Sequence, residues 1–238
     1  MLRIVLIGQG NVATSLHAAF SRKGMNVGMY SSRTGLSDLP QDADVYIYAV
    51  RDQALAEVVA QVHVQTRALH LHTSGSMPLS VFGPDKPHAG VLYPFRSFRK
   101  EAPIDDFGQV PVFIEARDVD DVAAVYTLAL SLTPYVYETK QSDRERLHVA
   151  GVFANNFSNL MYGIAADVLR GTSIPFSALL PLIDHTAAAV HGLSPAAAQT
   201  GPAVRGDEAV MAKHMELLTD PQLREVYQML SALIRRRS

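Results

Sequence analysis

The sequence predicts an α/β protein in which a mainly parallel sheet with its helices is followed by an all-helical part. Two observations carry this prediction. Up to residue 140, short β-branched or aromatic runs alternate with segments of helical periodicity, as in right-handed βαβ units. Beyond residue 140 only helical periodicity is visible. We therefore expect two domains, residues 1–140 and residues 141–238.

The predicted strands are short and mostly apolar, which indicates a sheet that is buried on both faces. They cover Leu2–Ile7, Asn26–Tyr30, Asp44–Val50, Arg67–His72, Ala89–Tyr93, Val110–Ala116 and Tyr135–Glu138. Between them, apolar residues at helical spacing predict helices over Asn11–Lys23, Asp52–Val62 and Asp118–Leu132. The second part is expected to hold one long helix over Gln141–Arg170 and further helices around Phe176–His191 and Pro221–Ile234.

Composition excludes several classes of protein. The 238 residues are 48% hydrophobic, enough for a sizeable core, and contain no cysteine, which rules out disulfides and thiolate metal sites. A net charge of -2 argues against a nucleic-acid partner. No histidine and acid set has metal-ligand spacing, so no metal is predicted. With no apolar run long enough for a signal peptide or a membrane helix, we expect a cytoplasmic protein without a membrane partner.

A glycine-rich turn follows the first strand. The segment GQGNVA has the form G-x-G-x-x-A, in which the first glycine makes the tight turn, the second admits a pyrophosphate and the alanine allows close packing of helix on strand. The N-terminus of the next helix would face the phosphates. This pattern predicts a Rossmann domain that binds a dinucleotide, and the alternative is a turn without a ligand. The predicted contacts are Gly8, Gln9, Gly10, Asn11, Val12 and Ala13.

The end of the second strand indicates which dinucleotide is bound. NAD enzymes usually carry an acid there, whereas this chain has Ser31, Ser32 and Arg33. Two hydroxyls and a guanidinium suit the 2′-phosphate of NADP, unless Arg33 is a solvated loop residue. Further contacts with the cofactor are expected after the third and fourth strands, at Val50, Arg51, Thr73 and Ser74. Asp52 is predicted to cap the helix that begins there.

Candidate catalytic residues lie on the long helix. His148, Asn155 and Asn156 are seven and eight residues apart, which places them on one helix face. Histidine suits proton transfer near neutral pH, and two adjacent asparagines in an apolar helix need polar partners. Arg96, among aromatic residues, and Arg205, between glycines, are candidates for binding an anionic substrate. Ordinary structural roles remain the alternative for each of these residues.

Five motifs together resemble a family of bacterial Rossmann-like proteins that is catalogued as a domain of unknown function and described as NADP oxidoreductases. They are GQGNVA, HTSGS, YPFRSF, HVAGVFANNF and TGPAVRGD. The family is distantly similar to pyrroline-5-carboxylate reductase, ketopantoate reductase, the β-hydroxyacid dehydrogenases and the deazaflavin-dependent NADP reductases. The resemblance implies a Rossmann domain, a helical domain that often builds a homodimer, and a cleft between them.

One departure limits what can be carried over. The β-hydroxyacid dehydrogenases and ketopantoate reductase have a lysine one turn before a helix asparagine, where this chain has Gly151 and Val152. Three hypotheses follow. The first is an NADPH-dependent reductase of a small carbonyl or imine, with or without a carboxylate on the substrate, and with His148 as the acid. The second is an NADP(H)-binding sensor without turnover, and the third is a dimeric scaffold with an empty cleft.

Overall fold

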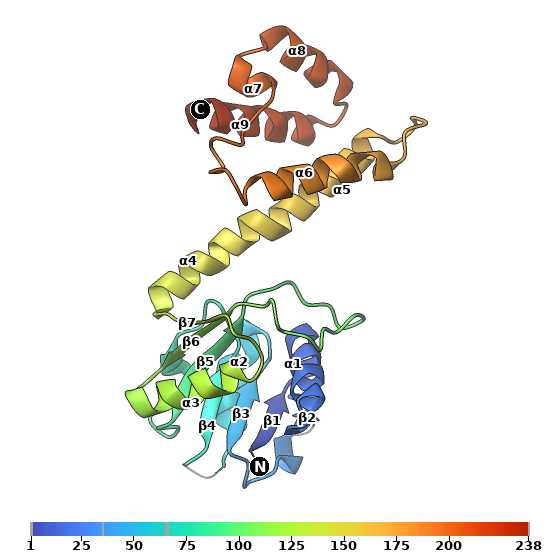
Figure 1. Ribbon diagram of the computed structural model, residues 1–238. Coiled ribbons are helices and arrows are strands. Elements are labelled where there is room, and N and C mark those ends of the chain that lie inside the picture. The colour runs from blue at the N-terminus through green and yellow to red at the C-terminus, as the bar shows by residue number, and fades with distance from the viewer. Residues whose placement is uncertain (1, 35, 65–66, 238) are drawn as a thin grey trace. The chain divides into compact units, whose positions relative to one another are not determined.

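The computed structural model describes residues 2–34, 36–64 and 67–237 (Figure 1). The chain divides into two compact units, Met1–Asn156 and Phe157–Ser238. Residues 141–156, which we assigned to a second domain, belong to the first unit by this division. The role expected of residues 141–238, substrate binding and dimerisation, stays a prediction.

The first unit is built on a sheet of seven strands, as far as the described residues show. Their order across the sheet is β2-β1-β3-β4-β5-β6-β7. Strands β1 to β5 are parallel, β6 is antiparallel to β5, and β7 is parallel to β6. The bounds are β1 Arg3–Ile7, β2 Asn26–Tyr30, β3 Val45–Tyr48, β4 Leu69–His72, β5 Ala89–Pro94, β6 Val112–Ala116 and β7 Val136–Glu138. The predicted mainly parallel sheet is confirmed.

Helices cover both faces of this sheet because its strands are apolar on both sides. On one face, Ile4 and Leu6 of β1 pack with helices α1 (Asn11–Arg22) and α3 (Val119–Leu130). On the other face, Val5 and Ile7 pack with α2 (Asp52–Gln61) and the short helix η2 (Leu79–Phe82). A further short helix, η1, covers Leu36–Asp38. The result is a three-layer α/β/α unit with two buried cores (Figure 1).

Strand β4 carries two buried histidines. Its sequence LHLH places Leu71 in the first core and turns His70 and His72 toward the aromatic rings of the opposite face. Burial lowers the pKa of each imidazole to about 3. Both side chains are therefore neutral near pH 7. His70 shares a hydrogen bond of 3.0 Å with the hydroxyl of Tyr48, which compensates for part of its burial.

The predicted long helix is interrupted in the structure. Helix α4 covers Gln141–Gly151, a π-helical segment covers Val152–Phe157, and α5 covers Ser158–Val168. The prediction of one uninterrupted α-helix is wrong at this segment, which holds both Asn155 and Asn156. Such π segments widen the helical turn and occur often at functional sites.

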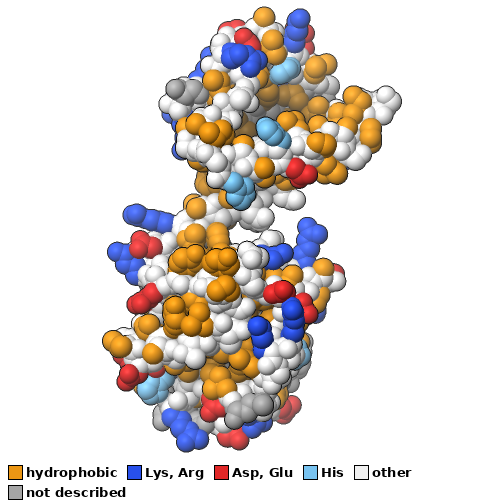
Figure 2. Space-filling view, in the orientation of Figure 1, with side chains coloured by type: hydrophobic (Ala, Val, Ile, Leu, Met, Phe, Trp, Pro, Cys, Tyr) orange, Lys and Arg blue, Asp and Glu red, His pale blue; other side chains and the backbone are white. Residues whose placement is uncertain are grey.

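The described part of the second unit contains helices joined by loops and no strand. After α5 come η4 (Phe176–Leu179), α6 (Leu180–Ala189), α7 (Pro202–Arg205), α8 (Glu208–Leu217) and α9 (Pro221–Arg237). Helix α7 was not predicted, whereas a helix after Asp207 was expected and is α8, with Asp207 at its N-cap. Large hydrophobic side chains gather on the surface of this unit (Figure 2), among them Leu182, Leu193, Leu217 and Met229. Among the described residues, no helix has both the length and the hydropathy that a bilayer crossing requires.

Candidate functional site

The predicted cofactor contacts meet at one edge of the sheet. Because β1 to β5 are parallel, the loops that follow them all leave the sheet at its carboxyl edge, where open α/β sheets bind ligands. Gly8–Ala13 follows β1, Ser31–Arg33 follows β2, Val50 and Arg51 follow β3, and Thr73 and Ser74 follow β4. The topology therefore brings these four segments to the same edge.

The glycines of the first loop have different roles. Gly8 has φ +124°, and a Cβ atom on it would lie 2.3 Å from the carbonyl oxygen of Ala49, so only glycine fits. A Cβ atom on Gly10 would meet no protein atom within 4 Å among the described residues. Packing within the protein thus explains why residue 8 is a glycine, but it does not explain why residue 10 is one. Because Gly10 has no side chain, the space beside its backbone stays open. Ala13 is fully buried against the sheet, as predicted for close helix packing.

The N-terminus of α1 suits a phosphate group. Its first turn has no acidic residue, and Gly10, at the N-cap, brings no side chain to its N–H groups. These N–H groups and the positive end of the helix dipole attract anions. The side chain of Asn11 accepts a hydrogen bond of 3.2 Å from the backbone N–H of Lys100, which fixes a neighbouring loop beside this turn. The observed turn therefore fits a bound diphosphate.

The loop after β2 carries an exposed cation, Arg33. The hydroxyl of Ser31 accepts a hydrogen bond of 3.2 Å from the backbone N–H of Arg33, which stabilises the turn. The Arg33 side chain is exposed and forms no ion pair with the described part of the chain. Ser32 is half-buried beside it. This arrangement leaves the guanidinium available for an anionic ligand.

The loops after β3 and β4 are joined by hydroxyl groups. Arg51, not Asp52, is the N-cap of α2, so the predicted cap is wrong. The carboxylate of Asp52 instead accepts a hydrogen bond of 2.5 Å from the hydroxyl of Ser76. Ser74 accepts hydrogen bonds from the backbone N–H groups of Ser76 and Met77 at 3.1 and 3.0 Å. These contacts hold the HTSGS segment in one conformation at the sheet edge.

A cavity of about 600 Å³ lies within the first unit, beyond the carboxyl end of β5. It is lined by all three predicted catalytic residues, His148, Asn155 and Asn156, together with the predicted anion-binding Arg96. The structure therefore brings together residues that lie up to 60 positions apart in the sequence. The other lining residues are Tyr93, Phe95, Ser97, Gly151, Val152 and Ala154.

Tyr93 and His148 form a hydrogen-bonded pair in this cavity. The hydroxyl of Tyr93 lies 2.9 Å from Nδ1 of His148. Gly75 lies directly against both rings, since a Cβ atom on it would come within 2.7 Å of Nδ1 and 2.9 Å of the hydroxyl oxygen. Neither Tyr93 nor Gly75 was among the predicted site residues. The YPFRSF motif pointed to this segment, but only Arg96 was singled out there.

The protonation states of two neighbouring side chains follow from their burial. Burial raises the pKa of Tyr93 to about 12, so its hydroxyl keeps its proton near neutral pH. His72 is fully buried with a pKa lowered to about 3, mainly by burial and also by the charge of Arg144. Its Nδ1 accepts a hydrogen bond of 3.2 Å from the backbone N–H of Ser74. His72 is thus a neutral structural residue, and His148 is the imidazole that lines the cavity.

Arg144 is a fully buried charge that sequence reasoning missed. One terminal nitrogen donates to the backbone carbonyls of Ser74 and Met77 at 3.2 and 3.0 Å. The other forms an ion pair of 2.8 Å with Glu115 of β6. Arg144 thereby joins α4 to the HTSGS segment and to the sheet. Its polar helical neighbourhood, QSDRER, gave no signal that it would be the buried member.

The absence of a lysine one turn before the asparagines has a steric explanation at Gly151. A Cβ atom on Gly151 would lie 2.7 Å from the ring of Phe95, so the aromatic ring occupies the space that any side chain there would need. The π-helical segment follows immediately and carries Asn155 and Asn156, whose carboxamides are 3.4 Å apart. The lysine-based arrangement of the β-hydroxyacid dehydrogenases therefore has no counterpart at this position.

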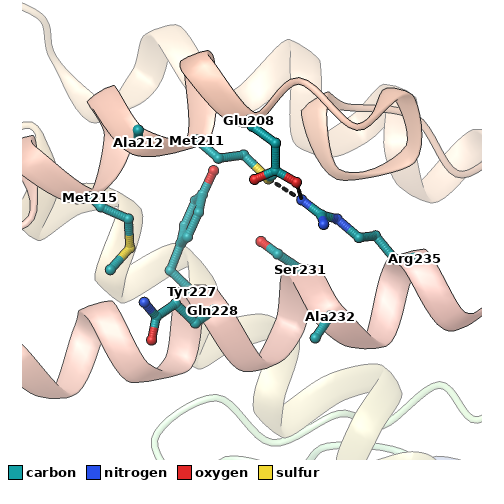
Figure 3. Close-up of a pocket in the computed structure, with 9 residues that line it drawn as sticks. All are labelled: Glu208, Met211, Ala212, Met215, Tyr227, Gln228, Ser231, Ala232 and Arg235. Atoms are coloured by element: carbon teal, nitrogen blue, oxygen red, sulfur yellow. Dashed lines mark hydrogen bonds and ion pairs between the residues drawn. The ribbon is translucent and has the colours of Figure 1, made fainter.

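Arg205 lies in the second unit and is not among the residues that line this cavity. Its guanidinium pairs with Asp207 at 2.9 Å, one of the alternatives that the sequence left open. The second unit has its own cavity of about 320 Å³ between α8 and α9 (Figure 3). There Arg235 is already engaged by Glu208 and by the sulfur of Met211. This neutralised pair makes the second cavity a weaker candidate for an anionic substrate.

One group of side chains elsewhere has the composition of a metal site. Ligand atoms of His88, Asp118 and Asp121 lie within 4.8 Å of one another. All three have structural partners: Asp121 accepts from Nδ1 of His88 at 3.0 Å and from the backbone of Ala89, and Asp118 caps α3. These contacts join the start of α3 to β5, so a structural role accounts for the cluster.

The sheet order, the glycine turn at its carboxyl edge and the helical second unit define a Rossmann-like protein with a helical C-terminal part. Residues 110–234 match the family described as "Domain of unknown function (DUF2520)". The chain belongs to this family, which confirms the resemblance found in the sequence. No curated protein matches the chain.

Solved structures support the same assignment. The protein from Bacteroides fragilis named "putative NADP oxidoreductase BF3122" is 40% identical, with 99% of this chain and 98% of that chain covered and a TM-score of 0.92. Protein TM1727 from Thermotoga maritima is 17% identical, with 98% and 97% covered and a TM-score of 0.74. An imine reductase from Myxococcus stipitatus in complex with NADP+ is 14% identical, with 98% and 93% covered and a TM-score of 0.68. The last two share the fold.

Replacing Arg144 tests its structural role. We expect Arg144→Met to lower the free energy of unfolding by about 3 kcal/mol, because Glu115 and two buried carbonyls lose their partner. Urea unfolding followed by circular dichroism measures the change. Arg146→Met, at an exposed position on the same helix, is the control and should change stability by less than about 0.5 kcal/mol. Equal effects of the two substitutions would contradict the assignment.

Proposed function

We propose that this protein is an NADPH-dependent reductase of a small carbonyl or imine compound that carries a carboxylate. The observation that carries the proposal is the cavity that joins His148, Asn155, Asn156 and Arg96 beside the sheet edge with the glycine turn. The 40% identical protein with NADP in its name supports the choice of cofactor. The imine reductase with the same fold supports the reaction class.

The cofactor would be held by the edge loops. The N–H groups at the start of α1, next to Gly10, would bind the diphosphate, and Arg33 with Ser31 and Ser32 would bind the 2′-phosphate. The loops at Val50, Arg51, Thr73 and Ser74 would border the nicotinamide half. When bound, NADPH supplies the hydride that reduces the carbonyl or imine carbon.

The protein's own residues would bind the substrate and supply a proton. Arg96 would pair with the substrate carboxylate, and the carboxamides of Asn155 and Asn156 would orient the reacting group by hydrogen bonds. His148 would donate the proton that the carbonyl oxygen or imine nitrogen takes up as the carbon is reduced. A substrate-binding role for Arg205 stays a separate proposal, and its observed partner is Asp207.

A second candidate function is an NADP(H)-binding sensor without turnover. Gly151 and Val152 favour it, because neither position holds the lysine of the related dehydrogenases, and Phe95 fills the space beside Gly151. The two functions share the cofactor and differ in chemistry. Tight NADPH binding without NADPH consumption, across a panel of small keto acids and cyclic imine acids, would favour the sensor.

We also propose that the protein is a homodimer. Exposed large hydrophobic side chains on α5, α6, α8 and α9 support this, since monomeric proteins rarely expose large apolar patches (Figure 2). A cavity of about 300 Å³ in the second unit has an almost wholly apolar lining. Such surfaces are suited to a second copy of the chain.

Cofactor preference should depend on Arg33. We expect NADPH to bind more tightly than NADH, and Arg33→Ala to weaken NADPH roughly 10- to 100-fold while NADH changes little, since a charged hydrogen bond to phosphate is lost. Fluorescence titration with both nucleotides measures this. Lys23→Ala, which removes an exposed cation at the end of α1, should leave both affinities unchanged. A wild-type protein that binds neither nucleotide would refute the proposed cofactor.

Proton donation should depend on His148. We expect His148→Ala to lower kcat roughly 100-fold or more with NADPH affinity retained, because a general acid is lost. NADPH absorbance, followed with the best substrate of the panel, measures the rate. Glu145→Ala, on the same helix and exposed, is the control and should keep full activity. Full activity in His148→Ala would exclude the assigned role.

The oligomeric state is tested by light scattering. We expect a mass twice the 25.9 kDa of one chain. A glutamate in place of exposed Leu182 in α6 should shift the protein toward monomer, because it places a charge in an apolar surface. Val119→Glu, at an exposed position in the first unit, is the matched control. A wild-type mass of one chain at micromolar concentration would disprove the dimer.

A further inference from the structure

The hydrogen bond between Tyr93 and His148 can be formed in two ways. In one, the phenol hydroxyl donates to Nδ1, and the neutral imidazole carries its proton on Nε2. In the other, Nδ1–H donates to the phenol oxygen, and Nε2 has no proton. Only the first arrangement gives His148 a proton at the nitrogen remote from Tyr93. The choice therefore decides whether neutral His148 can act as a donor in the cavity.

The packing shows which edge of the imidazole is covered. Nδ1 faces Tyr93 and the backbone of Gly75, where a Cβ atom would come within 2.7 Å of it. Tyr93 itself is 9% exposed, whereas His148 is an exposed residue on the cavity wall. The Nδ1 edge is thus held against the loop, and the Nε2 edge is the part of the ring that a substrate can reach.

Hydrogen-bond satisfaction favours the phenol as donor. The Tyr93 hydroxyl keeps its proton near neutral pH, because burial raises its pKa to about 12. Within the described part of the chain, Nδ1 of His148 is its hydrogen-bond partner. If Nδ1–H were the donor, the buried O–H would have no acceptor there, and an unsatisfied donor costs about 1–3 kcal/mol. Donation by Tyr93 leaves no such defect.

We propose that Tyr93 is a positioning residue that donates its hydroxyl proton to Nδ1 of His148 and so keeps the imidazole in the tautomer with the proton on Nε2, facing the cavity. The functional part of this inference rests on the proposed reductase activity, whereas the tautomer itself does not. Gly75 takes part because only a residue without a side chain lets both rings lie against its backbone.

The pair can also replace the proton that Nε2 of His148 gives to the substrate. When Nε2 gives its proton to the substrate oxygen or nitrogen, the phenol proton moves to Nδ1, so the imidazole stays neutral. Solvent then protonates Nε2, and the proton on Nδ1 returns to the phenolate oxygen. Burial opposes the transient phenolate most strongly and Asp52 opposes it further, whereas the positive charge of Arg144 lowers the pKa of Tyr93 and so favours it. The overall transfer consumes one solvent proton and leaves both side chains unchanged.

The tautomer can be measured without substrate or cofactor. Nitrogen-15 NMR of histidine-labelled protein at about pH 8.5, above the usual histidine pKa, distinguishes the two ring nitrogens. We expect the His148 signals, identified by their loss in His148→Gln, to show a proton on Nε2. Tyr93→Phe should convert them to a mixture of tautomers, and Tyr126→Phe, which changes an exposed tyrosine, should leave them unchanged. A proton on Nδ1 in the wild type would overturn the proposal.

Kinetics separate this proposal from the function on which it rests. We expect Tyr93→Phe to lower kcat roughly 10- to 100-fold with KM nearly unchanged, as for loss of a proton-transfer contribution. If no substrate is turned over, the reductase proposal fails and the NMR result still decides the tautomer. If Tyr93→Phe does not fold, Gly75→Ala provides the second variant, since its methyl group would push the two rings apart. Retention of the wild-type tautomer with the pair separated would also overturn the proposal.

Discussion

The candidate site depends on the buried guanidinium of Arg144. Its contacts with Ser74, Met77 and Glu115 join a helix, a loop and a strand that are distant in sequence. A buried charge with all these partners is costly to displace, so α4 is held in one rotation about its axis. His148 follows four residues later, on the same face of the helix. Anchoring Arg144 therefore places the imidazole of His148 against Tyr93 and Gly75.

Close packing at two glycines determines which side chains can line the candidate site. Gly75 lets the two rings of the pair touch the loop backbone, and Gly151 leaves room for the ring of Phe95. With the Phe95 ring in this place, a side chain at residue 151 would clash with it; residue 151 is, with Val152, one of the two positions one turn before the asparagines. Neither position holds a lysine, and the hydrogen-bonded Tyr93 and His148 both line the cavity.

Much of the fold and part of the candidate site could be predicted from local patterns. The order of strands and helices followed from periodicity, and the glycine turn identified the sheet edge at which Ser31, Arg33 and Ser74 lie. His148 was named because histidine suits proton transfer near neutral pH, and Asn155 and Asn156 because adjacent asparagines in an apolar helix need polar partners. The interruption of that helix was missed, because the apolar spacing continues through Val152–Phe157 and gives no sign of a wider helical turn. The cap at Asp52 was assigned wrongly because Ser76, which binds it, is 24 residues away.

The sequence by itself determined the α/β class, the position of the phosphate-binding turn and the residue types available at the sheet edge, because each depends on neighbouring residues along one strand, turn or helix. Only the tertiary structure decided that Arg144 is buried, that Tyr93 pairs with His148 and that Gly151 faces Phe95. Those features depend on which side chains meet across the sheet, the loops and α4. These tertiary contacts are set by packing between segments far apart in the chain, and local sequence patterns do not predict them.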